Sequence, residues 1–255
     1  MNSNRENINE YNIQNNSINV FLFCYNESAL LPHTVKHYKK YLPSCKIIVY
    51  DNESSDNSVE IARSLGCYIV SWGSNNTHNE DILINLRNTV WKTIENGWII
   101  IADMDEYVCV TETELVEEMK KGTNVLRIEG KNMIGESETI DLSDIDLQEI
   151  TKYVDNNMES KNLCFLREKI IEMCYGPGSH ACNPTGFNEI KYSSKIYINK
   201  HMEYLGLNFI KNKMIKRYER NEAMRKKGWN THYTDAIDVI THRYMNSLNN
   251  SKILE

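Results

Sequence analysis

Residues 97–108 read GWIIIADMDEYV, an apolar run that leads directly into carboxylates. The run from Trp98 to Ile101 has the composition of a strand buried on both faces. Because side chains two apart in a strand point to the same side, Asp103 and Asp105 are predicted to face one point. Two carboxylates placed in this way suit a hard divalent cation. The spacing alone fits a simple strand end equally well.

Three further units of strand and helix precede this stretch. Apolar strands are predicted at 18–25 (INVFLFCY), 46–51 (KIIVYD) and 67–72 (CYIVSW), and an amphipathic helix follows each of them. Short apolar strands that alternate with amphipathic helices are typical of a parallel sheet covered on both faces. Residues 18–110 are therefore predicted to form a Rossmann-like half, with GWIIIADMDEYV as its fourth strand.

The chain after Thr111 has a less regular pattern. A short helix (ELVEEMKK) and a strand (NVLRIEG) come first, and the polar, aperiodic residues 131–160 are predicted to form a loop over the site. Residues 161–200 are predicted to contain short strands around the turn-rich GPGSHACNPTG. The spacing of apolar residues predicts a further helix after His201.

The composition excludes several classes of protein. The formal net charge of −6 argues against general nucleic-acid binding, which needs a surplus of Lys and Arg. The chain has no signal peptide and no apolar run of membrane-spanning length, so we predict a cytoplasmic protein without a transmembrane anchor. Its seven cysteines are scattered without a CxxC pair, which indicates reduced thiols rather than a disulfide framework.

Polar clusters follow three of the predicted strands. They are Tyr25-Asn26-Glu27, Asp51-Asn52-Glu53 and Asp103-Met104-Asp105-Glu106. Ligands of open parallel sheets bind beyond the carboxyl ends of the strands, because the loops converge there. The three clusters are therefore expected to line one ligand site.

Four stretches together carry a resemblance to a known family: FLFCYNESALL, IIVYDNESSDNSVEIARSLGC, LRNTVW and GWIIIADMDEYV. In this order, over residues 18–110, they resemble family 2-like GT-A glycosyltransferases, in particular the branch with a D-x-D-E metal motif. The resemblance implies a metal-dependent enzyme that moves a sugar from a nucleotide-sugar to a hydroxyl of a glycan or another acceptor. UDP-sugars are the favoured donors, and inversion at the anomeric carbon is implied.

The predicted fold is accordingly α/β, with a GT-A Rossmann-like, mostly parallel sheet flanked by helices. We expect a single domain over residues 18–255. Residues 18–110 would be its nucleotide-binding half, and 111–255 a mixed α+β acceptor-side half with C-terminal helices. Residues 1–17 are rich in Asn, Ser and Glu and are predicted to be a flexible leader.

The resemblance implies roles for the residues at the nucleotide end. The loop Tyr25-Asn26-Glu27 would cradle the base and ribose, Asp51 would hydrogen-bond the base, and Arg87 would contact the nucleotide. Asn52 departs from the family's pattern, in which a second acidic residue usually follows the second strand. Asp51 is then the only acid at that tip, and the identity of the base stays open.

The same resemblance implies a site for Mn²⁺ or Mg²⁺. Asp103 would lie near the ribose and the metal, Asp105 would ligate the metal directly, and Glu106 would sit beside them. Such enzymes often bring a late histidine to the metal or the diphosphate. His180 and His201 are both candidates, since imidazole ligates Mn²⁺ or hydrogen-bonds phosphate. A plain structural histidine is the alternative for each.

The acceptor hydroxyl needs a general base within hydrogen-bond distance. Glu189, in GFNE, is the candidate carboxylate, and Glu136 competes with it. His180 is a second candidate catalytic residue.

Two groups near the C-terminus have a structural interpretation that we favour. The basic residues between Lys211 and Lys227 would grip a diphosphate, but charged helix faces are mostly solvated. Trp229, His232 and Tyr233 would stack on a sugar ring, but large aromatic side chains mostly pack in the interior.

Two other functions are alternatives to glycosyl transfer. IIIADMDEYV also resembles the first motif of haloacid-dehalogenase-like phosphatases, in which the leading Asp is a nucleophile. That family places the motif on the first strand of its core, whereas three strand and helix units precede it here. The second alternative is a non-catalytic domain that binds a nucleotide-sugar.

Overall fold

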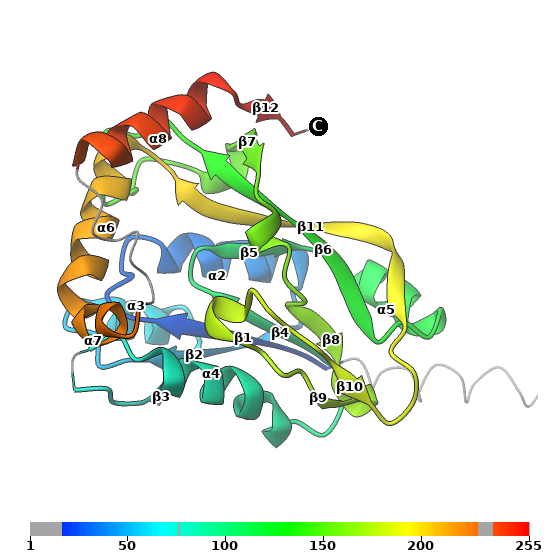
Figure 1. Cartoon of the computed structure of the whole chain (residues 1–255). Helices are drawn as coiled ribbons and strands as arrows, with labels where there is room; N and C mark the ends of the chain where they lie inside the picture. The colour runs from blue at the N-terminus through cyan, green and yellow to red at the C-terminus, as the bar shows by residue number, and fades with distance from the viewer. Residues whose placement is uncertain (1–16, 76, 229–236, 255) are drawn as a thin grey trace, which may run out of the picture.

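The computed structural model describes residues 17–75, 77–228 and 237–254 (Figure 1). The leader predicted at 1–17 lies outside the described residues except for Ser17, and so do Trp229, His232 and Tyr233. The helices are α2 (Leu31–Tyr41), α3 (Ser58–Ser64), α4 (Glu80–Thr89), α5 (Glu112–Lys120), α6 (Leu207–Arg220), α7 (Glu222–Lys226) and α8 (Ile237–Asn249). Among the described residues, no helix is long and apolar enough to cross a membrane.

The strands form one large sheet and one small one. Their bounds are β1 (Ile18–Cys24), β2 (Lys46–Asp51), β3 (Tyr68–Ser71), β4 (Trp98–Asp103), β5 (Glu106–Cys109), β6 (Val125–Ile134), β7 (Lys152–Asp155), β8 (Cys164–Leu166), β9 (Ile170–Glu172), β10 (Thr185–Gly186), β11 (Tyr192–Tyr204) and β12 (Lys252–Ile253). Short 3-10 helices are η1 (Val90–Thr93), η2 (Leu147–Glu149), η3 (Asn157–Glu159), η4 (Arg167–Lys169) and η5 (Pro177–Ser179).

The large sheet joins a parallel half to a mixed half. Its order is β12-β7-β6-β8-β4-β1-β2-β3, and β11 pairs with both β6 and β5. The strands β4, β1, β2 and β3 are mutually parallel, whereas β8 runs antiparallel to both β4 and β6. Strand β11 is parallel to β6, so their carboxyl ends meet at one edge. The predicted α/β class with a mostly parallel sheet and flanking helices is confirmed.

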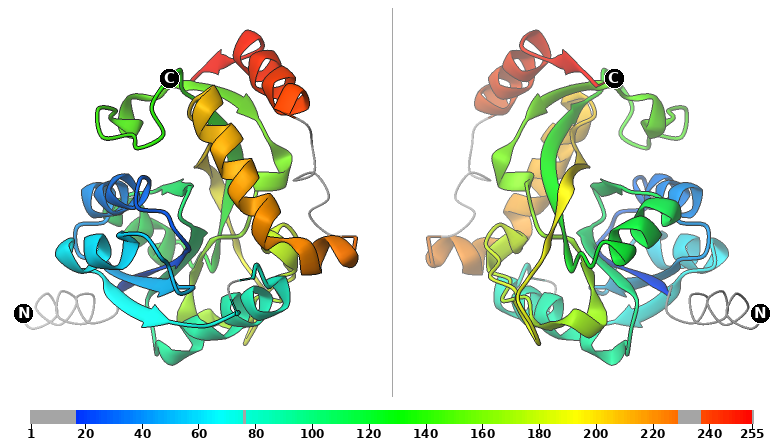
Figure 2. Two further views of the ribbon diagram at one scale, coloured as in Figure 1. Left: turned by 90° about the vertical axis from the view of Figure 1, so that its left-hand side faces the viewer. Right: turned by 90° about the vertical axis from the view of Figure 1, so that its right-hand side faces the viewer.

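Both faces of the central strands β1 and β4 are covered, because these strands are apolar on both sides. In β1, Val20 and Leu22 belong to the core under α2 and α3, while Phe21 and Phe23 belong to the core under α4 and η1. Figure 2 shows α2 and α4 on opposite sides of the sheet. This arrangement leaves the strand ends as the open edge where a ligand can bind.

Two sequence predictions need correction. GWIIIADMDEYV is not one strand, because β4 ends at Asp103 and a turn at Met104-Asp105 precedes β5. Residues 131–160 are not simply a loop: β6 continues to Ile134, and β7 adds a strand that pairs with it. The physical reason is that these segments find partners in the sheet that local polarity does not reveal.

Candidate functional site

A cavity of about 660 Å³ lies at the carboxyl ends of β1 and β4 and is bounded by β11 and α6. Cavities of this volume hold small-molecule ligands, and this edge is where open parallel sheets bind them. Eight of the residues predicted from the sequence line it: Tyr25, Asn26, Glu27, Arg87, Asp103, Asp105, His180 and His201.

Asp103 ends strand β4 and is held by a buried arginine. Arg87 of α4 donates a 2.7 Å hydrogen bond from Nη2 to Asp103 Oδ1 and a 3.1 Å bond from Nη1 to Glu80 Oε1. Burial opposes the charged form of Asp103, but Arg87 outweighs it, so the pKa of Asp103 is lowered. The predicted nucleotide contact Arg87 therefore also fixes the first aspartate of the motif.

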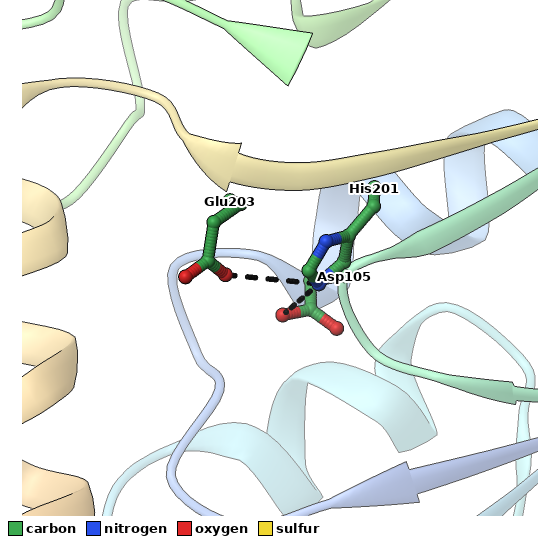
Figure 3. Close-up of side chains that lie close together, drawn as sticks. All are labelled: Asp105, His201 and Glu203. Carbon is green, nitrogen blue, oxygen red and sulfur yellow. Dashed lines mark ion pairs between the residues drawn. The ribbon is translucent and has the colours of Figure 1, made fainter. Parts of the chain in front are cut away.

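Asp105 faces two side chains of β11 (Figure 3). His201 Nε2 lies 3.4 Å from Asp105 Oδ2 and 3.7 Å from Glu203 Oε2. One ligand atom from each of the three residues lies within 4.8 Å of the other two. His201 and Glu203 point the same way because they are two apart in a strand, with Met202 buried between them. One imidazole and two carboxylates are a ligand set that suits a divalent cation.

Helix α6 brings a lysine to the same carboxylates. Lys213 Nζ lies 2.6 Å from Asp105 Oδ2 and 2.8 Å from Glu203 Oε2. Burial opposes the charged form of Glu203, but Lys213 and His201 outweigh it and lower its pKa to about 2. Burial likewise opposes the charged form of Lys213, and the two carboxylates outweigh it and raise its pKa. A solvated helix face, the interpretation favoured from the sequence, is therefore wrong for Lys213.

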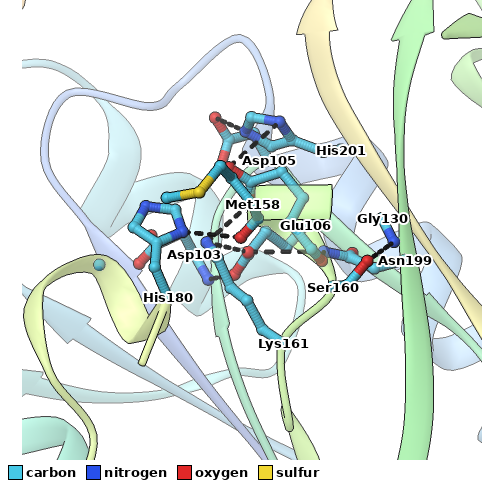
Figure 4. Close-up of polar contacts among 12 residues, drawn as sticks. Asp103, Asp105, Glu106, Gly130, Met158, Ser160, Lys161, His180, Asn199 and His201 are labelled. Atoms are coloured by element: carbon cyan, nitrogen blue, oxygen red, sulfur yellow. Dashed lines mark hydrogen bonds and ion pairs between the residues drawn. The ribbon is translucent and has the colours of Figure 1, made fainter. Parts of the chain in front are cut away.

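Glu106 lies beside the two aspartates in a buried polar network (Figure 4). Its Oε2 accepts a 2.8 Å hydrogen bond from the backbone N–H of Asp103, and its Oε1 accepts one of 2.7 Å from Lys161. Lys161 also lies 2.7 Å from Glu159, whose other oxygen is 4.0 Å from His201 Nδ1. Burial raises the pKa of Glu106 to about 7, although Lys161 opposes the shift. The network thus links the turn of the DxD motif to His201.

One end of the cavity, where the sequence predicts the nucleotide, is built from the loops after β1 and β2. Asn26 adopts a left-handed backbone (φ +53°), and its Oδ1 accepts hydrogen bonds from the N–H groups of Ser55 (2.7 Å) and Asp56 (3.3 Å). Asn tolerates this backbone region better than most residues. The guanidinium carbon of Arg220, on α6, lies 3.1 Å from the centre of the Tyr25 ring. The cation stacks on the aromatic side chain and brings α6 over this end.

Asp51 and Glu27 differ in their access to the cavity. Asp51 is buried and does not line the cavity, whereas its neighbour Asn52 does. Asp51 Oδ2 accepts a 3.1 Å hydrogen bond from the N–H of Ser54, and Oδ1 has no hydrogen-bond partner among the described residues. Glu27 does line the cavity, and burial together with the nearby Asp105 raises its pKa to about 7.

The late candidates are separated in space. His180 lines the cavity, and its Nδ1 lies 2.8 Å from the backbone oxygen of Met158. Glu189 is exposed and lies outside the cavity, three residues before the amino end of β11, while His201 and Glu203 line the cavity near the carboxyl end of that strand. Glu136 also lies outside the cavity and pairs with Lys152 at 2.5 Å. Strand β11 separates Glu189 from the site, whereas Glu136 follows the carboxyl end of β6, next to Tyr204, and its side chain pairs with Lys152 outside the cavity.

Sequence analysis assigned no role to Glu203, Glu159 or Lys161, and the solvated position favoured for Lys213 was wrong. The sequence around two of these residues, Glu203 and Lys213, has a pattern from which a place in the site could have been predicted. Glu203 repeats the x-Met-x alternation of the DxD motif, since His201 and Glu203 flank an apolar residue. Lys213 lies between Ile210 and Met214, on the apolar stripe of its helix, where a solvated lysine is not expected.

Comparison with protein families gives a match over part of the chain. Residues 19–138 match the model described as glycosyl transferase family 2. The resemblance predicted from the sequence is confirmed. The matched family 2 segment contains β1 to β6 and the DxD motif, while β11 and α6 lie beyond it.

Individual similar proteins share only part of their length with the chain. Protein RfbJ of Shigella flexneri is 31% identical over 55 residues, which are 22% of this chain and 43% of that protein. The structure of S. aureus TarS 1–349 has a TM-score of 0.45 and 14% identity, covering 81% of this chain and 66% of TarS 1–349.

A second similar structure is glucosyl-3-phosphoglycerate synthase from Mycobacterium tuberculosis, in a complex with Mn²⁺, UDP and glucosyl-3-phosphoglycerate. Its TM-score is 0.34 at 16% identity, covering 48% of this chain and 46% of the synthase. The chain thus covers less than two thirds of the length of each of the three proteins.

Proposed function

We propose that this protein is a metal-dependent glycosyltransferase that moves a sugar from a nucleotide-sugar, with UDP-sugars favoured, to an acceptor hydroxyl. The observation that carries the proposal is the convergence of Asp105, which lies in the segment that matches glycosyl transferase family 2, with His201 and Glu203 of β11. We also propose that residues 18–255 form a single domain and that residues 18–110 are its nucleotide-binding half. A glycan is the expected acceptor, and the cytoplasmic location stays a prediction.

The three side chains fit a resident Mn²⁺ or Mg²⁺. Their ligand atoms are at most 4.8 Å apart. Because Mg²⁺ lies about 2.1 Å and larger cations about 2.3–2.6 Å from oxygen, ligands on opposite sides of an ion are 4–5 Å apart, roughly the spacing found. When bound, the ion would neutralise charge on the departing diphosphate. Asp103 lies beside this set, but its Oδ1 is engaged by Arg87.

The chain's own residues would bind and orient the donor. Arg87, with the loop Tyr25-Asn26-Glu27, lines the end of the cavity away from α8 and would hold the nucleotide. Asp51 Oδ1 is a buried acceptor without a partner among the described residues, and it suits an N–H of the base. Asp51 lies just behind the lining residue Asn52, so a base that reaches it must insert between the loops.

The transfer step needs an acceptor for one proton. The acceptor oxygen forms a bond to the anomeric carbon, the bond from that carbon to the diphosphate oxygen breaks, and the hydroxyl proton passes to the base. Attack from the face opposite the diphosphate inverts the configuration. Of the two candidate catalytic residues, Glu189 and His180, we propose His180 as the base. Its Nδ1 can donate a hydrogen bond to the carbonyl of Met158, which leaves a lone pair on Nε2 to accept the proton.

Calorimetric titration tests the proposal. We expect UDP to bind in the presence of Mn²⁺ and to bind much more weakly without it, and UDP-, GDP- and dTDP-sugars can then be compared as donors. Asp105→Asn should abolish Mn²⁺-dependent binding, and Asp146→Asn, which changes a surface aspartate paired with Lys36, should not. Absence of nucleotide binding at millimolar concentrations with Mn²⁺ would sink the proposal. Binding without any transfer would favour a non-catalytic binding domain.

A further inference from the structure

Lys213 occupies the two carboxylate oxygens that the proposed metal would need. Its Nζ lies 2.6 Å from Asp105 Oδ2 and 2.8 Å from Glu203 Oε2. The same two oxygens face His201 Nε2, at 3.4 and 3.7 Å. The lysine and a divalent ion therefore have the same pair of partners.

The two cations cannot both use this pair favourably. Asp105, Glu203 and Lys213 have side chains that are only 6%, 12% and 8% exposed, so little water screens the charges. A divalent ion and an ammonium group on the same two oxygens would repel each other strongly at this depth. Binding of one must weaken or displace the other.

Lys213 can leave without movement of its helix. Its backbone is fixed by α6, where the neighbouring Ile210 and Met214 are buried against α8 and β11. Its side chain is a flexible four-carbon stem, so rotation about side-chain bonds can carry the ammonium away from the carboxylates. Lys213 already lines the cavity, so rotation can keep the charge inside the site.

We infer that Lys213 is a built-in counter-cation, which neutralises Asp105 and Glu203 in the metal-free protein and is displaced when a divalent ion binds. The inference rests on the proposed metal site. A nucleoside diphosphate gives the displaced ammonium a new anionic partner, and Arg217, 3.5 Å from Asp105 Oδ2, lies beside it. Metal and nucleoside diphosphate should consequently bind with positive cooperativity, and the metal alone should bind weakly.

The test is direct Mn²⁺ binding, measured by the electron paramagnetic resonance signal of free Mn²⁺ without nucleotide. Lys213→Met should lower the Kd for Mn²⁺ by about tenfold or more, because the competing charge is gone. Lys211→Met is the matched control, since it removes the same charge from the same helix at a position that does not line the cavity. Its Kd should stay within about twofold of the wild-type value.

Thermal unfolding gives a second readout if Lys213→Met folds poorly. Without its lysine the carboxylate pair loses its nearest cation, so the variant should have a lower Tm in EDTA and a larger rise in Tm with Mn²⁺ than the wild type. Equal Mn²⁺ affinities and equal Tm shifts in the wild type and the Lys213→Met variant would overturn the role of Lys213 without contradicting the proposed metal site. If neither protein binds Mn²⁺ even with UDP present, the proposed metal-dependent function itself fails, and the inference with it.

Discussion

Arg87 and Asp103 form a 2.7 Å ion pair that ties helix α4 to the end of strand β4. The Arg87 side chain is 5% exposed, and its second partner Glu80 is 7% exposed. Such a buried arginine serves two carboxylates at once. Its removal takes the ion-pair partner from Asp103 and leaves Glu80 with His78 and the N–H of Gly178. Breaking a buried pair in this way is more costly than the net contribution of an intact pair suggests.

Arg87→Met should therefore lower the free energy of unfolding by about 3–5 kcal/mol. Urea denaturation measures the change. The control is Lys92→Met, which breaks the pair of Lys92 with Glu172, whose side chains are 34% and 43% exposed. Solvent screens that pair, so its loss should cost no more than about 1 kcal/mol. Similar losses in the two variants would contradict the role given to Arg87.

The pH dependence of stability should contain a contribution from Glu203. The pKa of this carboxyl is lowered from 4.5 to about 2, because Lys213 and His201 outweigh the effect of burial. A lowered pKa stabilises the folded state above pH 4.5, and this stabilisation is lost as the pH falls toward 2. Its full size is about 3 kcal/mol.

Glu203→Gln removes this contribution and keeps the size of the side chain. Urea denaturation between pH 7 and pH 3 should show the variant less stable than the wild type at neutral pH, with the difference shrinking below pH 4.5. Glu168→Gln, at a carboxyl that contacts the N–H of Gly97, changes a glutamate away from the cavity and serves as control. A wild-type and Glu203→Gln difference that does not vary with pH would refute the coupling to Lys213.

The central strands β1 and β4 of the parallel half were predictable because they are buried on both faces. Every residue of β1 is buried, and an unbroken apolar run is what such a strand requires. The break between β4 and β5 was not predictable, since Met104 continues the apolar pattern. The turn depends on distant partners: the N–H of Met202 donates a 2.7 Å hydrogen bond to the carbonyl of Asp105. A contact of this kind leaves no trace in the local sequence.

The candidate site also has one part that was predictable from the sequence and one part that was not. Asp103 and Asp105 are visible in the sequence because they follow a strand whose end lies at the ligand edge. The ligand set around Asp105 comes from β11 and α6, and only the pairing of β11 with β5 and β6 brings His201 there. The sequence therefore offered His180 and His201 as equal candidates. The structure places His201, rather than His180, beside Asp105.

Gly130 sets the distance between β6 and the segment that carries Glu159. A Cβ atom at Gly130 would lie 2.4 Å from the backbone carbon of Glu159 and 2.6 Å from the carbonyl oxygen of Asn156. Backbone atoms cannot yield as a side chain can, so Gly130→Ala should cost about 1–3 kcal/mol. Because Glu159 lies beside Lys161 and His201, Mn²⁺ affinity should fall as well.

Gly73→Ala is the matched control for this substitution. The nearest atoms to its Cβ would be the carboxylate end of Glu53, at 3.0 Å, and Gly73 is exposed. That side chain can rotate away, so thermal or urea unfolding should change by no more than about 0.5 kcal/mol. Equal costs at the two glycines would show that η3 is not fixed by close packing on β6.

Glu189 should not be the general base. It precedes β11, and His201 lies nine positions after Tyr192, the first residue of that strand. At about 3.3 Å per residue this places the two ends of the segment roughly 30 Å apart, less where the strand is bulged. A general base must lie within about 3 Å of the proton it accepts, directly or through one water. Glu189→Gln should thus leave the rate of sugar transfer within about twofold of wild type, whereas a catalytic base typically contributes at least a hundredfold.

His180→Asn tests the other candidate in the same assay and should slow transfer strongly, since His180 lines the cavity. A large loss in Glu189→Gln with none in His180→Asn would reverse the assignment and require residues 187–191 to fold over the cavity in the complex with substrate.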